Sequence, residues 1–89
     1  MDFEISPELE KELKKIKSRD KQLIGKIEKQ LNLFQQNHKH PSLGTHNLSE
    51  TLENMWSISI DRNFQMLFFL DVSGAYFFEF GTHDQVYKG

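Results

Sequence analysis

The chain has 89 residues, of which 37% are hydrophobic and 27% charged, and its formal net charge is −2. This length supports one hydrophobic core, so we expect a single domain over residues 1–89. Cysteine is absent, which excludes disulfides, thiolate metal sites and a cysteine nucleophile. No apolar run approaches the roughly 20 residues that cross a bilayer, and the N-terminus lacks the apolar stretch of a signal peptide. We therefore expect a cytoplasmic protein without a membrane segment.

The charges are unevenly distributed along the chain. Residues 1–45 hold nine Lys or Arg and seven Asp or Glu, for a net charge of +2, whereas residues 46–89 hold two and six, for −4. A nucleic-acid-binding domain usually presents a basic face. The first half is the only candidate for such a face, although its lysines alternate with glutamates, as they also do on an ordinary solvated helix surface.

The first half predicts a short strand and a helix. Phe3 and Ile5 occupy alternate positions, which favours an opening strand. Ser6 can cap a helix, and Pro7 suits its first position because its missing N–H would be unpaired there. We expect this helix from residue 7 to about residue 17.

A second helix follows after a short break. Asp20 can cap it, and apolar residues then recur at helical spacing to about residue 36. These residues are Leu23, Ile24, Ile27, Leu31 and Phe34. So short a break predicts a helical hairpin. Gly25 costs about 1 kcal/mol relative to Ala inside a helix, and we interpret it as a point of close packing against the first helix.

In the second half the hydrophobic period changes to two. Residues 55–61 alternate apolar and polar side chains, residues 64–72 are apolar at nearly every position, and residues 75–80 form a further strand. The middle strand should be covered on both faces, with turns at 61–63 and 73–74. The fold class is therefore α+β, with the N-terminal helical hairpin packed on one face of a twisted antiparallel sheet of about four strands.

A few polar residues could carry chemistry. His83 follows the last strand, and histidine exchanges protons near neutral pH, although an exposed loop histidine is the more common case. Tyr87 lies four residues on, so a helical turn would bring the two side chains together. It could equally anchor on the sheet. Arg62 could hold a phosphate or pair with Asp61 in a solvated turn.

Three histidines lie in the loop between the helices and the later strands. His38 and His40 form an H-x-H pair, and His46 follows six residues later. Without a third ligand at a defined spacing, this pattern is weak support for a metal site. We therefore expect no metal.

Three motifs occur in a fixed order along the chain. They are His40-Pro41-x-Leu43-Gly44, then Asp61-Arg62-Asn63-Phe64-x-Met66-Leu67, then Gly81-Thr82-His83-Asp84-x-Val86-Tyr87. Together with the helical hairpin and the strand led by Trp56, this order resembles the RelE/ParE superfamily of bacterial type II toxins. It is most similar to the RelE, YafQ and HigB-like mRNA interferases, over nearly the whole chain.

The resemblance implies a toxin that inhibits translation by cleaving mRNA in the ribosomal A site. The RNA 2′-hydroxyl would attack the adjacent phosphate, without a metal or any other cofactor. The implied partners are the ribosome, mRNA and a cognate antitoxin protein.

The resemblance also implies roles for individual residues. The implied catalytic residues are His83 as general acid or base, Tyr87 for stacking or proton chemistry, and Gln65 at the position of the family's phosphate-clamping arginine. The implied RNA-binding residues are Arg62, His40, His46, Ser57 and Ser59, the two serines standing where RelE has lysines.

Two alternatives remain. Glutamine at position 65 lacks the charge that makes a hydrogen bond roughly twice as strong. Its presence, the missing strand lysines and the acidic second half favour a non-catalytic or ParE-like member that acts by binding DNA gyrase or an antitoxin. The other alternative is a small structural or interaction domain unrelated to toxins.

Overall fold

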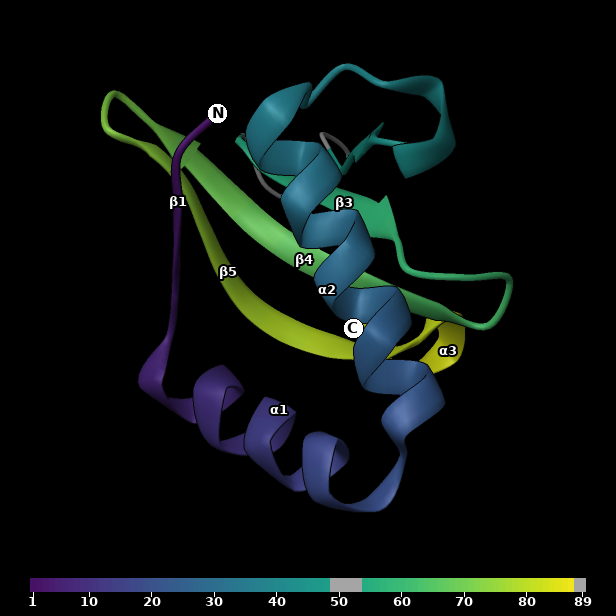
Figure 1. Ribbon diagram of the computed structural model, residues 1–89. Helices are drawn as coiled ribbons and strands as arrows, with labels where there is room; N and C mark the ends of the chain where they lie inside the picture. Colours follow the sequence, from purple (N-terminus) through teal and green to yellow (C-terminus); the bar gives the residue numbers. More distant parts are fainter. Residues whose placement is uncertain (49–53, 88–89) are drawn as a thin grey trace.

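The computed structural model describes residues 1–48 and 54–87 (Figure 1). The elements in chain order are β1 (Phe3–Ile5), α1 (Pro7–Arg19), α2 (Lys21–Gln36), the 3-10 helix η1 (Pro41–Leu43), β2 (His46–Asn47), β3 (Met55–Ser59), β4 (Phe64–Asp71), β5 (Gly74–Thr82) and α3 (His83–Tyr87). The predicted α+β class and the helical hairpin are confirmed.

The sheet differs from the prediction in its size and in one strand direction. It has five strands in the order β1-β5-β4-β3-β2. The strands β2 to β5 pair in an antiparallel manner, but β1 runs parallel to β5. The expectation of about four antiparallel strands rested on local hairpin signals. A parallel pair needs a long connection, here the helical hairpin, and leaves no such signal.

Both long helices begin at the predicted caps. The Ser6 hydroxyl accepts the N–H of Leu9 at 3.1 Å, and the Asp20 carboxylate accepts the N–H of Leu23 at 3.0 Å. The interpretation of Gly25 was wrong. It is exposed, and a Cβ placed there would have nothing within 4 Å, so packing does not require glycine.

The hydrophobic core lies between the sheet and the helices, which cover the same face (Figure 1). Phe34 of α2 packs edge-on against Phe68 of β4 and Phe77 of β5, with ring centroids 5.2 Å apart in both pairs. We call this covered side the inner face and the opposite side the outer face. The expected covering of β4 on both faces is incomplete, because Phe69 on the outer face is 36% exposed.

The turn between β3 and β4 depends on Asp61. Asp61 Oδ1 accepts the N–H groups of Asn63 and Phe64, and its Oδ2 pairs with Lys26 Nζ at 3.2 Å. The ion pair is therefore made across to α2 rather than with the neighbouring Arg62. Partial burial alone would raise the pKa of Asp61, but these hydrogen bonds and the lysine charge together lower the pKa below its usual value.

The hairpin between β4 and β5 is shifted by one residue from the prediction. Asp71 pairs with Gly74, so the two-residue loop is Val72 and Ser73 rather than Ser73 and Gly74. Gly74 has a φ of 132°, and a Cβ there would lie 2.5 Å from the carbonyl oxygen of Asp2. Glycine is thus required where β5 begins beside β1.

Candidate functional site

The outer face collects polar positions from three strands. Ser57 and Ser59 of β3 lie opposite Leu67 and Gln65 of β4, and Gln65 in turn lies opposite Gly81 of β5. Residues directly opposite one another in neighbouring strands share a face, with Cβ atoms about 5 Å apart. The register therefore places Ser59, Gln65 and Gly81 side by side, and we call these three residues the Gln65 row.

The short strand β2 extends this face at its edge. His46 is exposed and pairs with Ser57, so it belongs to the outer face. Just before it, Gly44 adopts a φ of 54°, and a Cβ there would lie 3.0 Å from Ser59 Oγ. The segment from Gly44 to His46 therefore runs close beside the two serines.

A capping box begins α3 at the other edge of the row. Gln85 Oε1 accepts the N–H of Thr82 at 2.8 Å, and Thr82 Oγ1 accepts the N–H of Gln85 at 3.3 Å. The spacing of a threonine and a glutamine three residues apart is a known signature of a helix start. This pair was not predicted from the sequence, although the signal is present in the Thr82-x-x-Gln85 motif.

Gly81 lets α3 rest on the outer face. A Cβ at Gly81 would lie 2.8 Å from Gln85 Oε1 and 3.4 Å from Val86 Cγ1. Gly81 is an outer-face position opposite Gln65, so α3 lies over the end of the Gln65 row. A larger residue at this position would first displace the Gln85 side chain, whose Oε1 accepts the Thr82 N–H, and would so disturb the start of α3.

His83 is the first residue of α3 and projects into solvent. Its side chain is 69% exposed, and Nδ1 lies 3.9 Å from Asp84 Oδ1, a loose ion pair. Tyr87 ends α3 one helical turn later. Its side chain lies outside what the structure describes, so the expected contact with His83 stays a prediction. Exposure allows His83 to exchange protons with a bound substrate.

Arg62 reaches the same end of the sheet from a different element. It is exposed in the turn between β3 and β4. Phe64, two residues later, pairs with Thr82, which immediately precedes His83. The turn that carries Arg62 and the start of α3 therefore lie at the same end of the sheet.

Two of the predicted site residues are less accessible. Ser57 is only 2% exposed, so its hydroxyl does not reach the surface. Gln65 Oε1 is buried and has no hydrogen-bond partner within residues 1–48 and 54–87. A buried acceptor without a partner costs about 1–3 kcal/mol. Gln65 therefore presents at most its amide nitrogen to a ligand.

His40 lies away from the outer face. It caps η1, because its Nδ1 accepts the N–H of Ser42 at 3.1 Å; the same nitrogen lies 2.9 Å from the Ser42 hydroxyl. The structure therefore separates His40 from His46. Across the described ranges, no group of three or more His, Asp or Glu side chains is placed to hold a metal ion.

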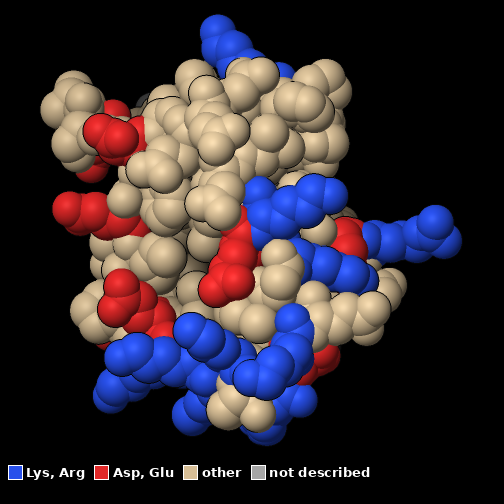
Figure 2. All heavy atoms as spheres, in the orientation of Figure 1, with Lys and Arg blue, Asp and Glu red and all other residues tan. Residues whose placement is uncertain are grey.

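Most cations lie on the helical layer instead of the outer face. Figure 2 shows Lys and Arg gathered over the end of the molecule where α1 turns into α2. The exposed cations of this region are Lys11, Lys14, Lys15, Lys17, Arg19 and Lys21, and we call them the basic hairpin. Considering residues 1–48 and 54–87 alone, no helix is long and apolar enough to cross a membrane.

Comparison with known proteins places this chain in a family. A protein of Methanocaldococcus jannaschii named "Putative toxin RelE4" is 33% identical to it over 89 residues, which is 98% of this chain and 90% of the relative. The chain belongs to the RelE toxin family. This confirms the resemblance to the RelE/ParE superfamily of type II toxins. No family model matches the chain.

Solved structures share the fold of this RelE-family chain. The Escherichia coli DinJ-YafQ complex matches with a TM-score of 0.76 at 19% identity, covering 97% of both chains. The YoeB-YefM complex from Staphylococcus aureus matches at 0.74 and 17%, covering 93% of this chain and 97% of that chain. The YoeB/ParE toxin from Agrobacterium tumefaciens matches at 0.76 and 13%, covering 93% and 99%. At these identities the likeness confirms the RelE/ParE-like fold.

Proposed function

We propose that this toxin cleaves mRNA on translating ribosomes and so inhibits protein synthesis. The observation that carries the proposal is that an exposed histidine, an exposed arginine and the Gln65 row lie at one end of the sheet. His83 is carried there by α3, and Arg62 by the turn before β4. Family membership supplies the toxin class, and this end of the sheet supplies groups suited to phosphate chemistry.

The proposed reaction is a transesterification within the RNA. The 2′-oxygen forms a bond to the adjacent phosphorus while the bond from phosphorus to the 5′-oxygen breaks. A base accepts the proton of the 2′-hydroxyl, and an acid donates a proton to the departing 5′-oxygen. The products are a 2′,3′-cyclic phosphate and a free 5′-hydroxyl. The nucleophile belongs to the RNA, so the chain needs no nucleophile of its own.

Each role has a candidate at this end of the sheet. His83 is the exposed proton-transfer group, and Tyr87 is proposed to stack on a base or to assist proton transfer. Arg62 and the Ser59 hydroxyl are proposed to hydrogen-bond phosphate oxygens, with Gln65 as a neutral donor. His46 lies along the face for a further RNA contact. Donors aimed at the developing negative charge lower the barrier, and a neutral Gln65 contributes less than an arginine would.

The ribosome and an antitoxin are the proposed partners. The basic hairpin presents lysines on the helical layer, where they could contact the phosphate backbone of ribosomal RNA. YoeB and YafQ are solved as complexes with YefM and DinJ. We extend that partner class to this chain, and expect a cognate antitoxin that binds it and blocks its activity.

The test examines the chemistry of the RNA ends. The purified chain is added to a bacterial cell-free extract translating a defined mRNA, and the recovered RNA is labelled with polynucleotide kinase without phosphatase treatment. We expect new labelled fragments, because transesterification leaves 5′-hydroxyl ends. Fragments that accept label only after phosphatase treatment would contradict the mechanism, and intact mRNA would contradict the activity.

A ParE-like binder that lacks nuclease activity is the second candidate function. The burial of Ser57 and the neutral Gln65 favour it, because the described outer face of β3 and β4 then carries no exposed lysine where RNA would lie. Inhibition of DNA gyrase supercoiling by the purified chain, with mRNA left intact in the extract, would support this alternative.

A further inference from the structure

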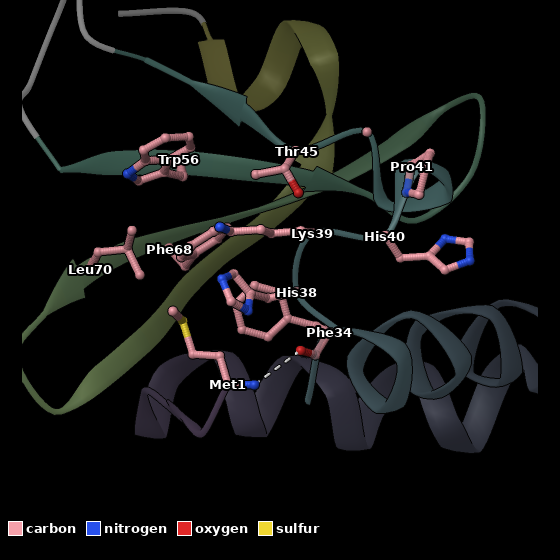
Figure 3. Close-up of a pocket in the computed structure, with 11 residues that line it drawn as sticks. Met1, Phe34, His38, Lys39, His40, Pro41, Thr45, Trp56, Phe68 and Leu70 are labelled. Carbon is pink, nitrogen blue, oxygen red and sulfur yellow. Dashed lines mark hydrogen bonds between the residues drawn. The ribbon is translucent and has the colours of Figure 1, made fainter. Parts of the chain in front are cut away.

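A cavity of about 550 Å³ opens on the inner side of the sheet, away from the Gln65 row (Figure 3). It lies beyond the end of α2, between the loop that leads into η1 and the strands β3 and β4. Its apolar lining includes Phe34, Trp56, Phe68 and Leu70. We call it the Trp56 pocket. Its volume is within the roughly 300–1,000 Å³ that is typical of ligand pockets.

The pocket exists because α2 is shorter than the sheet that it covers. The helix ends at Gln36. Phe34 in its last turn and Phe68 of β4 are 1% and 2% exposed. Trp56 and Leu70 also point to the inner face but remain only half-buried. Covering apolar surface gains about 25 cal/mol per Å². A partner that seats apolar side chains on Trp56 and Leu70 would therefore complete the core at this end.

The charge around the pocket selects the kind of partner. Its basic side chains are His38, Lys39 and His40, and none of its described lining residues is Asp or Glu. Figure 3 shows the Lys39 side chain pointing toward Trp56 and Phe68, so its ammonium group lies by the apolar lining. A ligand with apolar side chains and neighbouring carboxylates matches this arrangement. The Met1 ammonium also lines the pocket but is already bound to the backbone carbonyl of Gln35 at 2.7 Å, so Lys39 is the permanent cation left for a nucleic acid backbone.

We infer that the Trp56 pocket receives an acidic segment of the antitoxin, which inserts apolar side chains against Trp56 and Leu70. The inference rests on the proposed antitoxin partner and gives it a place on the molecule. Helical or extended segments commonly bind grooves in this way, through anchors on one face. The pocket and the Gln65 row lie on opposite faces of the sheet. Binding in the pocket therefore holds the antitoxin without using the residues proposed for cleavage.

Trp56 makes the inference directly measurable, because it is the chain's single tryptophan. The probes are overlapping 15-residue peptides that cover the protein encoded by the gene next to this one. The full chain is titrated with each peptide while Trp56 emission is followed. We expect a blue shift from at least one acidic peptide with apolar residues, and no shift from the same peptide with its acidic residues changed to Lys.

Matched variants test the contribution of Lys39 to peptide binding in the Trp56 pocket. Lys39→Glu should weaken binding of that peptide roughly tenfold at low salt, with a smaller effect as salt increases. Lys29→Glu makes the same charge change on the exposed surface of α2, outside the pocket lining, and should leave the affinity unchanged. Equal affinities for the two variants, or no emission shift with any peptide, would overturn the inference.

Two further measurements distinguish the antitoxin segment from a second copy of the chain, and the pocket from the cleavage activity. Sedimentation of wild type and Lys39→Glu, each without peptide, tests whether a second copy of the chain occupies the pocket. A dimer that forms with wild type but not with Lys39→Glu would overturn the antitoxin assignment. RNA cleavage without peptide should be the same for Lys39→Glu, Lys29→Glu and wild type. Peptide binding together with absent cleavage would contradict the proposed function while retaining the pocket assignment.

Discussion

Thr82 and Gln85 fix the start of α3 by exchanging two hydrogen bonds, one in each direction. Because His83 lies between them, this exchange determines where the proposed proton-transfer group stands relative to the sheet. Gly81 then allows the same glutamine to lie directly on the outer face. The position of the catalytic candidate thus depends on three residues, Gly81, Thr82 and Gln85, that take no part in the proposed chemistry.

Gln85→Ala should slow RNA cleavage strongly while lowering the free energy of unfolding only modestly. The variant loses the acceptor for the Thr82 N–H, a hydrogen bond that contributes about 0.5–1.5 kcal/mol, and His83 loses its fixed position. Gln85→Glu is the matched control, since it keeps an acceptor at the same place. Cleavage rates and thermal melts of the three proteins decide the matter. Equal cleavage by Gln85→Ala and Gln85→Glu would show that the capping box does not position His83.

Gln65→Arg should raise the cleavage rate about tenfold or more, because it adds a charged donor for the phosphate oxygens. It also removes the buried Oε1 that lacks a partner. Gln65→Met serves as the control. It removes the same acceptor without adding a charge, so it should raise the free energy of unfolding by about 1 kcal/mol while lowering cleavage. If Gln65→Arg cleaves no faster than wild type, position 65 is not a phosphate contact.

Gly25→Ala should raise the free energy of unfolding by about 1 kcal/mol, since alanine favours a helix interior and glycine does not. The position is exposed, and nothing lies within 4 Å of the added Cβ. Urea denaturation at neutral pH measures the change, and cleavage activity should stay at the wild-type level. A destabilised variant would mean that α2 needs glycine for a contact beyond the described residues.

The Asp61 turn should make stability depend on pH. The folded-state pKa of Asp61 is below the usual 3.8. Its contribution to stability is therefore present above that usual value and is lost as pH falls through the folded value. Asp61→Asn keeps a turn acceptor but loses the charge that pairs with Lys26. Wild type should exceed this variant in unfolding free energy at pH 7, and the difference should shrink toward pH 3. A difference that stays constant with pH would contradict this account.

The sequence predicted those parts of the fold that local chemistry determines. Ser6 and Asp20 identify both helix starts because capping involves residues only three positions apart. The parallel pairing of β1 with β5 could not be predicted, since it joins distant segments without a turn signal. The hairpin loop was misplaced by one residue because Gly74 serves the close approach of Asp2 rather than the turn itself.

The candidate site was predictable only in part. The family motifs identified Gln65, Ser59 and His83, and strand register then places the first two on one face. The burial of Ser57 and the separation of His40 from His46 depend on packing across several elements, which no single motif records. The Trp56 pocket was also beyond prediction, because it arises where α2 ends relative to the far end of β3 and β4.

His83 carries out mRNA cleavage on the ribosome in the proposed mechanism, and one measurement tests this role directly. Primer extension maps the 5′ ends of an mRNA in a bacterial cell-free extract, with the chain added either during translation or after initiation has been blocked. We expect discrete new ends only during translation with wild type, and none with a correctly folded His83→Ala variant. Full-rate cleavage by His83→Ala, or identical ends in untranslated mRNA, would contradict the account.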